Sequence, residues 1–235
     1  LLCPCFFEGR RFTKGGVHYL EDQGRLIPVG ETEFARDATF GYRASDLCEW
    51  IEERSEGRVP SGRVARCDLS VLRGGRAEAL LRDTESPYVV VDGMEEGDMR
   101  LAAQAVFAAH ASGRRFVIRS AASLVQALCG QPGWPPLRPE ALRDAGGSGG
   151  LVVVGSHVAR TNAQLEALRS CPGTWVEFRV DADPACEQIC AAKAVETALR
   201  RGETAVLYTS RTVAASGTPE EQLAFSAGVS RAVAG

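Results

Sequence analysis

The chain has 235 residues and a mass of 25.1 kDa, enough for one large domain or two small ones. Hydrophobic residues make up 45% and charged residues 24%, values typical of a globular protein that exclude disorder as its main state. The net charge of −3 excludes a generally basic surface for nucleic acid. Apolar runs such as Leu151–Val154 are far shorter than the roughly 20 residues of a membrane span. We therefore expect neither a nucleic-acid partner nor a membrane partner.

Eight cysteines are many for this length, but their spacing matches neither a redox pair nor a zinc site. We expect buried free thiols in a reducing cytoplasm, where free cysteine behaves as a small hydrophobic residue. The N-terminus does not resemble a signal peptide, which also favours a cytoplasmic location. The spacing of His18, His110 and His157 predicts no metal site, and without a nucleophile elbow we exclude a metalloenzyme or a hydrolase.

The first part of the chain is predicted to be rich in loops, with a hairpin of two short strands. Val17–Leu20 and Leu26–Val29 flank a turn whose Gly24 can take a positive φ. Pro28 lacks an amide hydrogen, which places its strand at the edge of a sheet.

Strands and helices then alternate. Ser45 is expected to cap a helix over Asp46–Glu53. Repeated units of this kind favour a parallel sheet covered by helices. The expected strands are Val64–Leu69, Tyr88–Val91 and Phe116–Ile118, and the expected helices are Arg76–Arg82, Asp98–Ala111 and Ala121–Cys129.

A domain boundary is predicted within Gln131–Gly150, where four prolines precede a run of glycines. A second α/β series follows. We therefore predict an α/β fold with two three-layer parallel-sheet domains, residues 1–145 and 146–235. The second series consists of strands Leu151–Val154, Thr174–Val180 and Thr204–Tyr208, and of helices Thr161–Arg169, Pro184–Arg200 and one that begins at about Pro219.

The sharpest local motif is an apolar strand that ends in Gly155-Ser156 and leads into a helix. In open α/β sheets, ligands bind beyond the carboxyl ends of strands, where helix N-termini offer N–H groups to anions. Gly155 would let the backbone approach a phosphate, and the Ser156 hydroxyl could donate a hydrogen bond. The alternative is an ordinary strand-to-helix turn with Thr161 as the N-cap, because no complete phosphate-binding motif is present.

Two other segments offer polar groups for a ligand. Arg36, beside Asp37 in an irregular segment, could pair bidentately with a carboxylate, or could form a surface ion pair. Arg119 and Ser120 follow an apolar strand; the alternative is that Ser120 caps the next helix and Arg119 is solvated. His18 could face a cleft, although a single histidine in a strand is more often structural.

Taken together, these segments closely resemble the four-carbon acid sugar kinase family, in the same order across essentially the whole chain. The segments that carry the resemblance are Cys3–Arg10, Val17–Leu20, Glu31–Arg43, Ser45–Leu47 with Trp50–Glu53, Arg119–Val125, Gly150–His157 with Thr161 and Gln164, Thr209–Arg211, and Val229–Ser230.

The resemblance implies a kinase that uses ATP and Mg²⁺ to phosphorylate a terminal hydroxyl of a four-carbon sugar acid, such as threonate, erythronate or a 3-oxo-tetronate. It implies an N-terminal substrate-binding domain and a C-terminal nucleotide-binding domain, with small molecules as partners; a homodimer is compatible with it. It identifies no catalytic base. The ATP-binding candidates are Gly155, Ser156, Thr161 and Gln164, and the substrate candidates are Arg36, Asp37, Arg119, Ser120 and His18.

Two motifs of the family are missing: an acidic Asp-Asp-x-Thr-Gly segment at the start and glycine-rich nucleotide-binding segments at the end. We therefore expect both domains to be truncated, and a fragment with little or no activity of its own, because phosphoryl transfer depends on a complete clamp around the phosphates. The alternative is a non-catalytic remnant that binds a sugar acid or another partner. A dehydrogenase is disfavoured, because no glycine fingerprint follows a strand.

Overall fold

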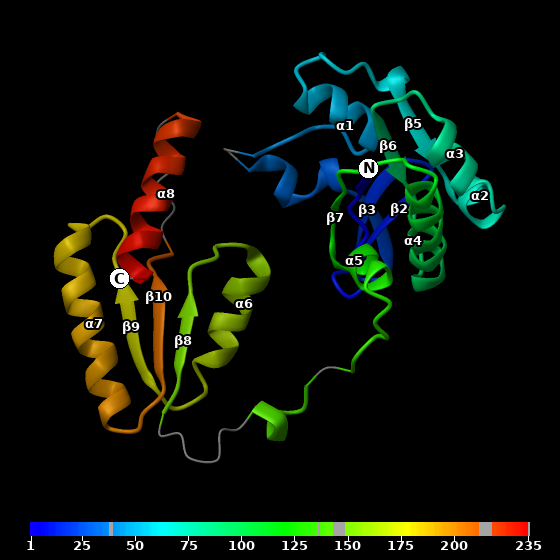
Figure 1. Cartoon of the computed structure of the whole chain (residues 1–235). Coiled ribbons are helices and arrows are strands. Elements are labelled where there is room, and N and C mark those ends of the chain that lie inside the picture. The colour runs from blue at the N-terminus through cyan, green and yellow to red at the C-terminus, as the bar shows by residue number, and fades with distance from the viewer. Residues whose placement is uncertain (38–39, 136, 143–148, 212–217, 235) are drawn as a thin grey trace. The chain divides into compact units, whose positions relative to one another are not determined.

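The computed structural model describes residues 1–37, 40–135, 137–142, 149–211 and 218–234. The chain divides into two compact units, Leu1–Pro135 and Pro136–Gly235, which are described separately below (Figure 1). The expected boundary between residues 145 and 146 lies outside the described residues. Within the described ranges, no helix is long and apolar enough to cross a membrane.

The first unit is built on a four-stranded parallel sheet. Its two central strands, Leu2–Cys3 and Tyr88–Val91, are apolar on both faces, as expected where helices cover a sheet on both sides. The strand order is β5-β6-β1-β7, and Leu2 of β1 lies opposite Val90 on one side and Arg119 on the other. The strands are β1 (Leu2–Cys3), β5 (Val64–Cys67), β6 (Tyr88–Val91) and β7 (Arg119–Ser120).

Helices cover both faces of this sheet, so the predicted three-layer arrangement is confirmed (Figure 1). Helix α1 (Leu47–Arg54) packs on the face that carries Leu2 and Val90. Cys3 and Val91 alternate to the opposite face. The core on that face is completed by α2 (Leu69–Arg73), α3 (Ala77–Asp83), α4 (Glu96–Ala111) and α5 (Ala122–Leu128).

The predicted hairpin is confirmed as part of a small antiparallel sheet, with Pro28 in its edge strand. The sheet is tied to the parallel sheet because the backbones of Thr13 and Gly93 exchange two hydrogen bonds. Its strands, in the order β2-β3-β4, are β2 (Arg11–Lys14), β3 (Val17–Asp22) and β4 (Arg25–Pro28). The first unit also contains the short 3-10 helices η1 (Val29–Glu31), η2 (Glu33–Arg36) and η3 (Ser61–Arg63).

The cap of the first α-helix was predicted one residue too early. The Asp46 carboxylate, not Ser45, accepts hydrogen bonds from the N–H groups of Cys48 and Glu49. The Ser45 hydroxyl oxygen instead accepts the N–H of Gly30. A side chain therefore caps the helix as expected. It is Asp46 and not Ser45, because the Ser45 hydroxyl is already bonded to the loop that contains Gly30.

The predicted strand over Phe116–Ile118 is wrong. The ladder begins at Arg119, which lies opposite Leu2 of β1. Before that point, Val117 is 89% exposed. Sequence analysis also missed α2, which starts directly after β5 because Asp68 caps it through the N–H of Val71.

Only half of the cysteines follow the expectation of buried free thiols. All eight are free; Cys3, Cys5, Cys48 and Cys67 are buried in the first unit, whereas Cys129, Cys171, Cys186 and Cys190 are exposed.

The second unit is a three-stranded parallel sheet in the order β8-β10-β9. Helices α7 and α8 pack on the face of Val176 and Leu207. Arg169, just after α6, lies over the rings of Trp175 and Tyr208 on the opposite face. The elements are η4 (Pro139–Leu142), β8 (Leu151–Val154), α6 (Ala159–Leu168), β9 (Thr174–Phe178), α7 (Pro184–Arg200), β10 (Ala205–Thr209) and α8 (Pro219–Ala234).

Candidate functional site

The turn between β8 and α6 has the features expected of an anion-binding turn. Gly155 and Ser156 are exposed, and a Cβ atom added to Gly155 would meet open space. The Ser156 hydroxyl oxygen accepts the N–H of Val158 at 3.5 Å, which leaves its hydrogen available for donation. No side chain among the described residues caps α6, so its first N–H groups can serve an anion.

The two other nucleotide candidates lie further along α6. Thr161 is the third residue of the helix and is half-buried, so the alternative that it is the N-cap is wrong; Val158 holds that position. Gln164 is exposed on the same helix. The structure thus places Gly155 and Ser156 together at the turn, and Gln164 more than one helical turn away.

Arg211, for which the sequence alone predicted no role, contacts this turn. Arg211 follows β10, the neighbour of β8, and parallel neighbours end at the same edge of a sheet. Its guanidinium donates to the backbone oxygens of Val154, Ser156 and Thr209 and to the side-chain oxygen of Asn162. The sequence contained a signal for Arg211 as a site residue, because the polar segment Thr209-Ser210-Arg211 directly follows an apolar strand.

His157 completes the cluster at this edge. Its Nε2 lies 3.3 Å from the hydroxyl of Thr209, and its backbone oxygen accepts a hydrogen bond from the Asn162 amide. Burial, followed by the charge of Arg211, lowers the pKa of His157 below its usual value. The ring is therefore neutral at pH 7, and the fixed positive charge of this edge belongs to Arg211.

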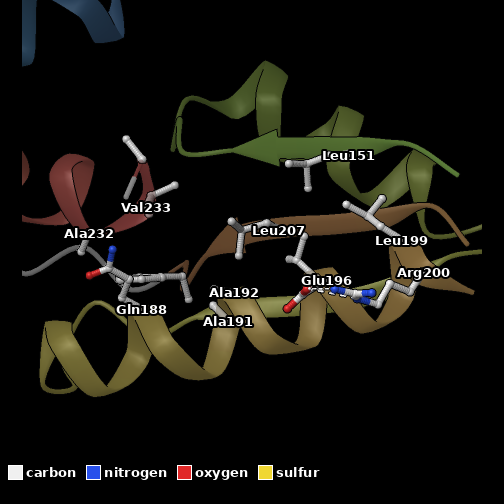
Figure 2. Close-up of a pocket in the computed structure, with 13 residues that line it drawn as sticks. Leu151, Gln188, Ala191, Ala192, Glu196, Leu199, Arg200, Leu207, Ala232 and Val233 are labelled. Carbon is white, nitrogen blue, oxygen red and sulfur yellow. Dashed lines mark hydrogen bonds and ion pairs between the residues drawn. The ribbon is translucent and has the colours of Figure 1, made fainter.

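A pocket of about 590 Å³ in the second unit lies elsewhere, on the face of the sheet that α7 covers (Figure 2). Leu151, Leu207 and Ala191 point into it, and the ion pair between Glu196 and Arg200 lies at its side. Neither Gly155 nor Ser156 lines this pocket. Because a mostly apolar wall offers little to a phosphate, we place the nucleotide candidates at the turn.

In the first unit, Asp92 marks the carboxyl edge of the parallel sheet. It follows β6, is 1% exposed, and accepts the N–H groups of Gly15 and Gly16 at 2.6 and 3.0 Å. Both glycines have a positive φ. Burial raises the pKa of Asp92 above its usual value, although the two N–H donors oppose that shift. This buried carboxyl group anchors the β2–β3 turn at the edge where open sheets bind ligands.

His18, a substrate candidate, is buried beneath this turn with 6% of its surface exposed. Its Nδ1 lies 2.9 Å from the hydroxyl of Thr13, and this hydroxyl oxygen also accepts a hydrogen bond from the Cys5 thiol. Burial, then the charge of Arg11, lowers the pKa of His18 to about 4. The ring is therefore a neutral member of a buried polar network.

The remaining substrate candidates are more accessible than His18. Arg36 ends η2, and Asp37 follows it; both are exposed. Arg119 lies over the ring of Trp50 at 5.1 Å, and Ser120 does not cap α5, whose N-cap is Ala121. No three His, Cys, Asp or Glu side chains among the described residues could hold a metal ion.

Family comparisons match both units. The model of a sugar-binding N-terminal domain matches residues 1–128, and the model of a nucleotide-binding C-terminal domain matches residues 151–235. The chain is thus a two-domain α/β protein that combines a sugar-binding domain with a nucleotide-binding domain. This pair of domains is the architecture of the four-carbon acid sugar kinase family, and the chain belongs to that family. A search of curated proteins found no match.

Two solved structures are similar to this chain, one of them with a TM-score above 0.5. A Salmonella typhimurium LT2 protein, provisionally described as a tRNA synthase, is 15% identical with a TM-score of 0.53; the match covers 98% of this chain and 52% of that one. A Haemophilus influenzae protein assigned to the DUF1537 family is 16% identical with a TM-score of 0.48, and the match covers 99% and 54%. The chain therefore spans about half the length of these solved proteins.

Proposed function

We propose that the protein acts in the ATP-dependent phosphorylation of a terminal hydroxyl of a four-carbon sugar acid. The observation that carries the proposal is the order of the two domains, sugar-binding over residues 1–128 and nucleotide-binding over residues 151–235. A kinase needs both an acceptor site and a nucleotide site. The proposal includes the expected boundary between the two domains, at residues 145 and 146.

The chemistry at the β8–α6 turn supports the nucleotide half of the proposal. Phosphoryl transfer depends mainly on positioning and on electrostatic stabilisation of the phosphates. The first N–H groups of α6 and the Ser156 hydroxyl would bind phosphate oxygens, with Gly155 leaving room for them. We assign Thr161 and Gln164 to the same site. Mg²⁺ would be held mainly by the nucleotide phosphates.

In the sugar-binding domain, the acceptor's carboxylate requires a cation. Arg36 and Arg119 are both exposed, and Arg119 lies over the ring of Trp50, so both arginines are suited to this role. Asp37 and Ser120 would bind hydroxyl groups. We assign His18 a supporting role, because its ring is buried.

Ligand-induced stabilisation tests the proposal directly. Thermal unfolding of the 235-residue chain would be followed with Mg-ATP, and separately with threonate, erythronate and 3-oxo-tetronates. A ligand at 100 times its Kd stabilises the folded state by about 2.7 kcal/mol. We expect stabilisation by Mg-ATP and by one of the acids. Stabilisation by both without ADP formation would indicate binding without turnover, and stabilisation by neither would contradict the proposal.

Replacing Ser156 by alanine should weaken nucleotide binding without affecting folding. The side chain is exposed, so its loss leaves the core intact, whereas a lost hydrogen bond of about 1 kcal/mol raises the Kd for Mg-ATP about fivefold. Calorimetric titration measures the change. Ser170→Ala, just beyond the same helix, is the matched control and should bind as the wild type does. An unchanged Kd in Ser156→Ala would remove this residue from the site.

Replacing Arg36 by alanine should weaken binding of the sugar acid. A charged hydrogen bond to a carboxylate contributes about 1.5–3 kcal/mol, so we expect a Kd at least about tenfold higher. Arg63→Ala, at another exposed arginine of the first unit, is the control. If Arg36→Ala lowers only the melting temperature and leaves the Kd unchanged, Arg36 has a structural role.

A further inference from the structure

We infer that Arg211 is a positioning residue of the nucleotide site: it shapes the β8–α6 turn and does not itself bind phosphate. The inference rests on the proposed function of that turn. An arginine beside a nucleotide site would ordinarily be taken for a phosphate-binding group. The contacts of Arg211 point to a different role.

All three nitrogens of the Arg211 guanidinium are engaged within the protein. Nε donates to the backbone oxygen of Thr209 at 3.0 Å. Nη1 donates to the backbone oxygen of Ser156 at 2.6 Å and to Oδ1 of Asn162 at 3.1 Å. Nη2 donates to the backbone oxygen of Val154 at 3.3 Å and to both oxygens of Thr209 at 2.9 Å. These six contacts share the five N–H donors that a guanidinium has.

The acceptors explain what Arg211 does to the turn. Val154 and Ser156 both direct their carbonyl oxygens to the guanidinium. In a planar trans peptide, the N–H points opposite to the carbonyl oxygen. Holding these two oxygens therefore turns the N–H groups of Gly155 and His157 away from Arg211. Arg211 thus orients the backbone of the turn that we propose binds the phosphates.

The geometry also explains why this position needs arginine. The acceptors come from three segments: the end of β8 with its turn, the first part of α6 (Asn162), and the end of β10 (Thr209). A planar fork with five donors can hold them together, whereas an ammonium group has three donors on one flexible atom. Lysine would keep the charge but lose the bridge between the three segments.

Variants of Arg211 separate positioning from phosphate binding. Mg-ATP affinity would be measured by calorimetry for the wild type, Arg211→Lys and Arg211→Ala, with Arg200→Lys on α7 as a control at an exposed arginine. We expect both Arg211 variants to bind about tenfold more weakly and Arg200→Lys to bind normally. Wild-type affinity in Arg211→Lys would overturn the inference, because it would show that charge alone is needed.

Amide hydrogen exchange at positions 158 and 162 provides a readout without nucleotide, because these N–H groups are hydrogen-bonded to Ser156 Oγ and to the backbone oxygen of Val158. We expect faster exchange in Arg211→Lys, because the turn loses the hydrogen bonds of the guanidinium; unchanged exchange would overturn the inference.

If the wild type binds no Mg-ATP while exchange is still faster in Arg211→Lys, the proposed function fails and the structural role of Arg211 stands. If the Arg211 variants do not fold, Asn162→Ala removes one acceptor and should also speed exchange; wild-type exchange there would overturn the inference.

Discussion

Acidification from pH 6.5 to pH 4 should destabilise the first unit by about 3 kcal/mol through His18 alone, because its pKa is lowered to about 4 in the folded protein. The unfolded chain takes up a proton near pH 6.5, whereas the buried ring stays neutral until about pH 4. Between these values the unfolded state binds more protons. Stability is therefore lost as the pH falls through this window, and it is fully present only above it.

Urea unfolding between pH 4 and pH 7.5, followed by NMR signals of the first unit, measures this effect. His18→Gln should flatten the dependence of the unfolding free energy on pH, even if it also lowers stability at neutral pH. His110→Gln is the control, because His110 is exposed at the end of α4. A pH dependence in His18→Gln that equals that of the wild type would show that His18 does not carry the effect.

Replacing Phe178 by alanine should destabilise the second unit by about 3–5 kcal/mol, which is much of the stability of a small domain. Phe178 is 1% exposed and packs with Val176, Ala191 and Leu207 between the sheet and α7. Truncation removes its transfer free energy and leaves a cavity in this core. Thermal unfolding measures the loss.

Phe225→Ala is the matched control, because this phenylalanine on α8 is 44% exposed. It should cost less than about 1 kcal/mol. NMR signals of the first unit should remain native in Phe178→Ala, since Phe178 belongs to a core formed by the second unit alone. Similar losses in the two variants would contradict the assignment of Phe178 to the core.

Features that depend on neighbouring residues were predictable. The hairpin of Val17–Leu20 and Leu26–Val29 follows from its alternation and its glycine turn, and α7 begins at Pro184 and ends at Arg200 as expected. The strand at Phe116–Ile118 was wrong because pairing with β1 begins at Arg119, opposite Leu2, and this register is set from outside the segment. An apolar run shows that a strand is favourable but does not show where it is paired.

The candidate site shows the same division. Gly155 and Ser156 could be found because an apolar strand that ends in small residues before a helix is a local pattern. Arg211 lies 55 residues from Ser156, and its role depends on β8 and β10 being neighbours in the sheet. Asp92 and the glycines of the β2–β3 turn are similarly distant in the sequence. No local pattern indicates such pairs.

Composition, periodicity and motif order thus establish a two-domain α/β protein, its family resemblance and the turn at Gly155, because these depend on residue types and short spacings. Tertiary structure decided which side chains meet. It buried His18 in a polar network, placed Arg119 over Trp50, and engaged every guanidinium nitrogen of Arg211 with the turn, with Asn162 or with Thr209. The physical reason is that burial and hydrogen-bond partners are set by strand order and register, which join residues far apart in the chain.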